Sequence, residues 1–114
     1  MHAGRKALLH EAVLKLIETW RPKLGVTVGA YFLHRMKTKW GSGNHRAGNI
    51  GLNTELASKP KDLLEYVAVH EMAHLLAPRH SERFESIFDR HFPSWKDSRA
   101  ELNNLPPAAE KWNA

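Results

Sequence analysis

The segment of residues 62–76 limits the fold of this chain more than any other part of the sequence. Its apolar residues recur at helical spacing and form a broad stripe: Leu63, Leu64, Val67, Ala68, Met72 and Leu75. This periodicity predicts an α-helix that buries the stripe against the rest of the protein. Because Pro78 disfavours helical geometry at the residue before it, we expect the helix to stop at Ala77.

The segments before this helix predict one further helix and a small sheet. Apolar residues at helical spacing indicate an N-terminal helix: Ala7, Leu8, Ala12, Leu16, Ile17 and Trp20. Pro22 and Gly25 are expected to end it. Residues 26–36 are rich in β-branched and aromatic residues and predict a strand. The glycine-rich residues 39–49 predict a loop or wide hairpin turn, followed by a second strand at 49–56 that pairs with the first.

The segments after Pro78 predict two more helices. Ser81 can cap a helix at 82–92 through the amide of Phe84, and a last helix is expected to start at Pro93. Residues 106–114 are typical of a loose C-terminal tail. The sequence therefore predicts an α+β fold with a single domain at residues 1–105, which suits a chain of 114 residues.

The composition favours a cytoplasmic protein. No apolar run approaches the roughly 20 residues that cross a bilayer, and the basic N-terminal segment is amphipathic, unlike a secretory signal. The sequence has no cysteine, so no disulfide or thiolate metal site is expected. The net charge of +5 permits attraction to nucleic acid, and a nucleic-acid-associated partner stays open. Because the lysines and arginines are scattered, we favour an ordinary solvated surface.

His70, Glu71 and His74 form an H-E-x-x-H motif on the expected helix of residues 62–76. Histidines four residues apart lie on one helical face, one turn apart, where both imidazoles can bind the same ion. Glu71 then lies beside the metal and outside its first shell. This is the arrangement of zinc hydrolases, and a catalytic site of that type needs a third protein ligand and a water.

Three residues are candidates for the third ligand. His80 follows His74 by six residues, and the chain can turn at Pro78 to bring it back over the first two ligands. Glu85, one helix later, is the second candidate. His91 is better explained as a charge near a helix C-terminus, where the helix dipole favours it. We therefore favour His80.

A zinc ion in such a site would make its bound water acidic and polarise an amide carbonyl. Glu71 would take the proton from that water and pass it to the leaving amine. The residue that stabilises the oxyanion is not evident from the sequence. Tyr66, His45 and Arg83 are candidates, although Tyr66 suits a packing role and Arg83 a surface charge.

Several motifs together resemble one known family. "RMKTKWGSGN", "GNIGLNTEL", "LEYVAVHEMAHLLAPRHSERF" and "FPSW" occur in this order, and the resemblance covers residues 5–105. They resemble the YgjP-like metallopeptidase domain, a zincin family related to SprT-like and WLM proteases. The resemblance implies a small zincin-like fold and a peptide or protein substrate. It also implies His70, His74 and His80 as zinc ligands, with Glu71 as the base.

The sequence departs from the family pattern at two places. Gly43 stands where the family usually has cysteine, and the N-terminal β-rich region found in many members is absent. Trp40, just before this position, suits a packing role better than substrate stacking. Asn49 and Asn53 flank the second strand as turn formers, and an exposed edge of that strand offers a place for a peptide to pair.

Two classes of function fit these observations. The first is a zinc-dependent metallopeptidase in which Glu71 is catalytic. The second is a metal-stabilised binding module, such as a subunit of a nucleic-acid-processing complex, with a structural zinc. A structural site needs a fourth protein ligand and no positioned carboxylate. The sequence has Glu71 and no compelling fourth ligand, so it favours the metallopeptidase.

Overall fold

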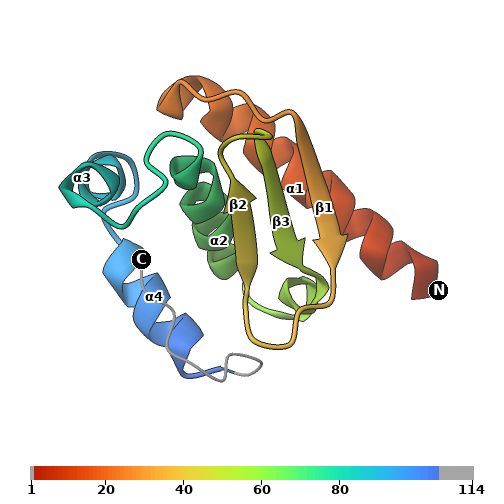
Figure 1. The fold of residues 1–114 in the computed structure, drawn as a ribbon. Helices are drawn as coiled ribbons and strands as arrows, with labels where there is room; N and C mark the ends of the chain where they lie inside the picture. The colour runs from red at the N-terminus through yellow and green to blue at the C-terminus, as the bar shows by residue number, and fades with distance from the viewer. Residues whose placement is uncertain (1, 106–114) are drawn as a thin grey trace.

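The computed structural model describes residues 2–105 and has the predicted α+β architecture (Figure 1). Its elements follow in this order: α1 (His2–Leu24), β1 (Ala30–His34), β2 (Gly41–Asn44), β3 (Asn49–Asn53), the 3₁₀ helix η1 (Thr54–Ser58), α2 (Lys61–His74), α3 (Glu82–His91) and α4 (Trp95–Asn103). The expected loose tail at 106–114 lies outside the described residues. No helix within residues 2–105 is long and apolar enough to cross a membrane.

The buried face of α1 differs from the predicted one. Its core residues follow a spacing of four, four, three and four: Leu9, Val13, Ile17, Trp20 and Leu24. Leu8 was expected in this stripe, but its side chain is 65% exposed. Adjacent leucines at 8 and 9 made two helical faces compatible with the sequence, and packing against α2 selects the face that includes Leu9.

The end of α1 agrees with the prediction at Gly25 but not at Pro22. The helix continues through Pro22 to Leu24, and Gly25 ends it with a positive φ of 69°. Pro22 lacks an N–H, but the carbonyl left without this partner belongs to Glu18, which is exposed to solvent. The N–H groups of Gly25 and Val26 both donate to the carbonyl of Arg21, which closes the helix.

The sheet has three strands in the order β1-β3-β2. β3 pairs with β1, as predicted, but the two strands are parallel, and β3 also pairs with the antiparallel β2. The prediction of a loop or wide hairpin turn at 39–49 was correct only for residues 45–48, which form the turn between β2 and β3, because Gly41–Asn44 forms the edge strand β2. The four residues of β2, two of them glycines, have no alternating apolar pattern, so no strand was predicted there.

Asn53, at the end of β3, holds the connection between β1 and β2. It is fully buried, and its side-chain amide donates to the carbonyls of Met36 (3.0 Å) and Lys39 (2.8 Å). Its side-chain oxygen accepts from the N–H of Glu55 (3.0 Å) and so caps η1. Asn53 is thus more than the turn former expected from the sequence, because it ties three segments together.

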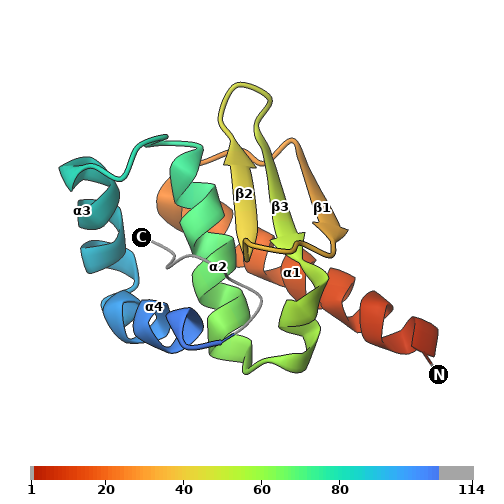
Figure 2. The ribbon, with the colours of Figure 1, turned by 60° about the horizontal axis from the view of Figure 1, so that its bottom comes forward.

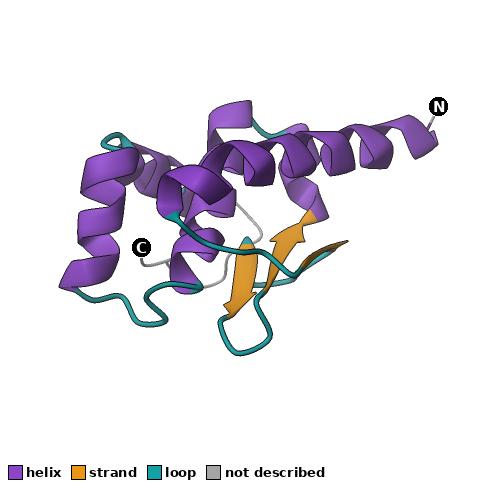
Figure 3. Ribbon diagram, turned by 90° about the horizontal axis from the view of Figure 1, so that it is seen from above, coloured by secondary structure: helices purple, strands orange, loops and turns teal. Residues whose placement is uncertain are grey.

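Helix α2 lies in the centre of the molecule, between the sheet and α1 on one side and α3 and α4 on the other (Figures 1 and 2). Figure 3 shows α1 running along one side of the sheet. Every residue from 66 to 73 is buried, so α2 is enclosed on all sides over two turns. The helix ends at His74, three residues before the expected stop.

Helices α3 and α4 close the side of α2 that faces away from the sheet. The Ser81 hydroxyl accepts from the N–H of Phe84 (3.4 Å), as predicted for the cap of α3. Phe88 packs between Tyr66 and Trp95, with ring centroids 5.8 and 5.7 Å away. Helix α4 begins at Trp95, two residues later than predicted. This aromatic packing fixes the start of α3 next to the H-E-x-x-H motif.

Candidate metal centre

The structure brings His70, His74 and His80 together. One ring nitrogen from each lies within 4.8 Å of the others, so the three side chains could hold a single metal ion. His70 and His74 project from the last turns of α2, and His80 comes from the segment between α2 and α3. Within residues 2–105, no fourth histidine, aspartate or glutamate joins this group.

The geometry of His74 and His80 fits a shared metal ion. Their Nε2 atoms are 3.1 Å apart. Two nitrogens at 2.0–2.1 Å from one tetrahedral zinc would be about 3.3–3.4 Å apart, so little movement is required. The Nδ1–H of His74 donates to the Pro78 carbonyl (3.1 Å), which leaves Nε2 with its lone pair directed at His80. Pro78 therefore both follows the helix end and orients a candidate ligand.

The ring of Phe84 supports all three imidazoles. Phe84 is fully buried at the start of α3, and its ring centroid lies 5.2 Å from His70, 4.6 Å from His74 and 5.0 Å from His80. The Ser81 cap fixes the first turn of α3 and therefore this ring. An apolar surface behind the histidines limits both their rotamers and the entry of water from that side.

The three histidines run from the core to the surface. His70 is 1% exposed, His74 is half-buried and His80 is exposed. Burial lowers the pKa of His74, and the neighbouring His70 lowers it further. Partial burial, with His70 and His74 nearby, lowers the pKa of His80 to about 4. Both imidazoles are therefore neutral at pH 7, which is the state that binds a metal.

Glu71 is buried beside the cluster. Its Oε2 accepts a hydrogen bond from Nδ1 of His70 (3.1 Å), which places the ring proton of His70 on Nδ1. Burial lowers the pKa of His74 and His80, and the negative charge of the Glu71 carboxylate opposes this effect by raising the pKa of both. A buried carboxylate this close to three imidazoles is able to accept a proton from a molecule bound between them.

Two glycines of β2 make room for Glu71. A Cβ atom on Gly41 would lie 2.8 Å from Oε2 and 2.9 Å from Cγ of Glu71. A Cβ atom on Gly43 would lie 3.2 Å from Oε1 of Glu71 and 3.2 Å from Cβ of His74. Gly43, where cysteine was expected from the resemblance, thus faces the H-E-x-x-H motif directly, and its lack of a side chain leaves this approach open.

The other candidates from the sequence lie apart from the histidine cluster or inside the core. Glu85 is exposed on α3 and His91 ends that helix, and neither belongs to the cluster. His45 is exposed in the turn between β2 and β3, and Arg83 is exposed on α3. Tyr66 is fully buried, its ring is 5.9 Å from that of His70, and burial raises the pKa of its hydroxyl well above the usual range.

Sequence reasoning missed Phe84, the Pro78 carbonyl and Gly41 as parts of this site. Phe84 had a weak signal, because Ser81 was expected to cap its amide and so to fix its position. The roles of the Pro78 carbonyl and of Gly41 depend on contacts between separate segments, which no local pattern encodes.

The α+β fold, with an H-E-x-x-H motif on a buried helix and a third histidine after it, defines a small zincin-like protein. The chain belongs to the YgjP-like metallopeptidase domain family, whose profile matches residues 2–105. It is a member of a metallopeptidase family, as the resemblance implied.

Two solved structures share the fold. The metallopeptidase zymogen abylysin of Pyrococcus abyssi is 23% identical, with a TM-score of 0.73 over 81% of this chain and 92% of that chain. The metallopeptidase zymogen jannalysin of Methanocaldococcus jannaschii is 18% identical, with a TM-score of 0.65 over 82% of this chain and 92% of that chain. A search of curated proteins gave no significant match.

Proposed function

We propose that this protein is a zinc-dependent peptidase in which His70, His74 and His80 bind zinc and Glu71 is the general base. The observation that carries the proposal is that ring nitrogens of the three histidines lie within 4.8 Å of one another. The buried Glu71 carboxylate is hydrogen-bonded to His70 beside them. Membership of a metallopeptidase family supports the reaction class.

The donor set supports zinc. Three imidazole nitrogens with no thiolate and no fourth protein ligand within residues 2–105 match a catalytic zinc site, which keeps one position for water. When bound, the ion supplies a water that ionises near pH 7 and polarises the scissile carbonyl. A structural zinc would require a fourth protein ligand, so the donor set favours catalysis over the binding-module alternative.

Glu71 performs the proton transfers in this proposal. Its carboxylate accepts a proton from the attacking water and later donates it to the leaving nitrogen of the amide. The hydrogen bond from His70 and the glycines of β2 hold the carboxylate in a single position. Because Glu71 is buried, few competing waters reach it, and its position is set before the substrate binds.

The edge strand β2 is the proposed place for the substrate backbone. The expected pairing of a peptide with the second predicted strand is wrong, because that strand is β3 and both of its edges are already paired. Among the described residues, β2 pairs only with β3, and Ser42, Gly43 and Asn44 are exposed. A peptide or protein segment that adds to β2 would lie next to Glu71.

Two further expectations are retained as proposals. Residues 1–105 form one metallopeptidase domain, and the protein works in the cytoplasm. The domain proposal is supported by a family match over residues 2–105, and the cytoplasmic location by a sequence without cysteine.

The test compares the zinc-loaded wild type with Glu71→Gln on unfolded casein. The variant keeps the side-chain shape, so it should bind zinc and fold normally while its turnover falls by ~10²–10⁴-fold. Glu85→Gln, an exposed glutamate outside the cluster, is the matched control and should keep wild-type turnover. Equal cleavage by wild type and Glu71→Gln would refute the role of Glu71. Zinc binding without cleavage by either would favour the binding module.

A further inference from the structure

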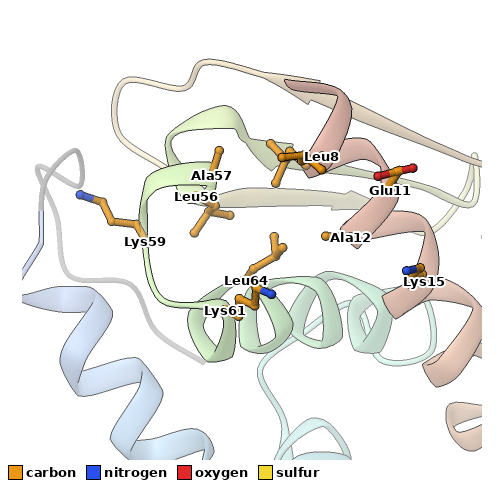
Figure 4. Close-up of a pocket in the computed structure, with 10 residues that line it drawn as sticks. Leu8, Glu11, Ala12, Lys15, Leu56, Ala57, Lys59, Lys61 and Leu64 are labelled. Carbon is orange, nitrogen blue, oxygen red and sulfur yellow. The ribbon is translucent and has the colours of Figure 1, made fainter. Parts of the chain in front are cut away.

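A second feature of the molecule is an apolar groove between α1, η1 and the start of α2 (Figure 4). Its volume is about 660 Å³, within the range of roughly 300–1,000 Å³ that is typical of ligand pockets. None of its lining residues belongs to the histidine cluster or to β2. The groove is therefore a site separate from the proposed catalytic centre.

The floor of this groove is apolar and belongs to the hydrophobic core. Leu9, Leu56 and Leu64 are buried members of the hydrophobic core and come from three different elements. Leu8 also lines the groove, and its side chain is 65% exposed, the most exposed large apolar side chain among the described residues. A partner that covered Leu8 and the floor would remove this apolar surface from water, which favours binding.

Three lysines surround this floor. Lys15 lies on α1, Lys59 follows η1 and Lys61 begins α2, whereas Glu11 is the only acidic residue of the lining. Lys59 and Lys15 lie at opposite ends of the groove in Figure 4, with Lys61 between them. The rim therefore has an excess of two positive charges, spread along the length of the groove.

We propose that this groove binds an acidic amphipathic helix of a partner protein. An apolar floor between two helices suits the apolar face of a third helix. Ammonium groups at both ends and in the middle pair with several carboxylates on one segment, whereas a single carboxylate of a small ligand would leave lysines without a partner. This proposal concerns a partner and does not depend on the proposed peptidase activity.

The test measures binding of a synthetic peptide by fluorescence anisotropy. The probe is a fluorescein-labelled helix of about four turns, with leucines at i, i+3, i+4 and i+7 and glutamates elsewhere. The wild-type protein should bind it with a Kd of about 10–100 µM, because the groove is smaller than a standard interface. Higher salt should weaken binding, since part of the attraction is electrostatic.

Two variants of the groove have matched controls. Leu8→Glu should weaken binding at least ~10-fold, whereas Leu14→Glu should not, because Leu14 is a 47% exposed leucine of the same helix outside the groove. The double variant Lys15→Glu and Lys61→Glu should weaken binding to a similar degree, whereas Lys37→Glu, outside the groove, should not. All four variants are measured in the same assay, and circular dichroism verifies that each is correctly folded.

Three outcomes would overturn the proposal. The first is no binding at about 1 mM peptide. The second is equal binding of a scrambled peptide, or of one with lysine in place of glutamate. The third is binding of the protein to phosphatidylglycerol vesicles, abolished by Leu8→Glu, without binding of the peptide, which would assign the groove to a lipid surface.

Discussion

Gly41 and Glu71 approach so closely that a single Cβ atom on Gly41 would lie 2.8 Å from the Glu71 carboxylate. The same Cβ would lie 2.9 Å from Cγ1 of Val67. Neither neighbour can withdraw easily, because both lie on the buried part of α2. β2 and α2 are therefore in contact at Glu71, the residue to which we assign the proton transfers.

Gly41→Ala is expected to displace Glu71 and lower turnover on casein by at least ~10-fold, with a stability cost of about 1–3 kcal/mol from overpacking. Zinc binding should change less than turnover, since no ligand is altered. Gly29→Ala is the control, because its Cβ would meet only ordinary contacts at 3.4 Å or more. Wild-type turnover in Gly41→Ala would contradict the proposed position of the base.

His80→Ala removes a residue that we expect to bind the zinc directly. Loss of a residue that only contacts a ligand typically weakens metal binding by about 10–100-fold, and His80→Ala should weaken it more than that. Glu85→Ala should bind zinc like the wild type, since Glu85 is exposed and lies outside the cluster. A competition titration with a chromophoric chelator measures both affinities. If Glu85→Ala were the weaker binder, the third ligand would be a glutamate and the assignment of His80 would be wrong.

Phe84→Leu is expected to weaken zinc binding by about tenfold, a loss comparable to that of an outer-shell partner. The leucine keeps an apolar residue in the core but removes the ring that contacts all three histidines. Phe88→Leu is the matched control, because Phe88 is equally buried but its ring contacts only His70 within the cluster, at 6.0 Å. Equal zinc affinities in the two variants would show that the Phe84 ring does not support the site.

The metal-free protein is expected to lose stability as the pH falls from about 6.5 to about 4. The folded state lowers the pKa of His80 to about 4 and also lowers that of His74, so the unfolded chain binds more protons in this window. Stability contributed by the neutral histidines is complete above pH 6.5 and declines as they become protonated. Urea midpoints measured with a chelator at several pH values test this. The decline should be smaller in His80→Ala, and an unchanged slope would contradict it.

The sequence predicted those features that depend on local spacing. The α2 helix, its end near Pro78 and the Ser81 cap all follow from periodicity, proline geometry and capping chemistry, and the structure agrees within a few residues. His70 and His74 had to share a face once the helix formed. Bringing His80 close to them required only one turn of chain after Pro78.

Features that depend on contacts between distant segments were missed. β2 has no apolar alternation, because its two glycines allow the close approach to α2, so it was predicted as part of a loop or wide hairpin turn. The parallel pairing of β1 and β3, and the hydrogen bonds by which Asn53 holds the connection after β1, join separate segments, and no local pattern reveals them. The face of α1 was ambiguous because leucines occupy both positions 8 and 9, and only packing against α2 decides between them.

The steep change in burial across the three histidines has a kinetic consequence. His70 lies on a helix enclosed on all sides and can move only if the domain opens globally, whereas His80 lies on an exposed segment that can swing away alone. A bound ion would therefore be released in steps. His80 would dissociate from it first, while His70 and His74 still held it. Metal exchange should accordingly be fast relative to unfolding, and amide protons near residue 80 should exchange with solvent long before those of α2.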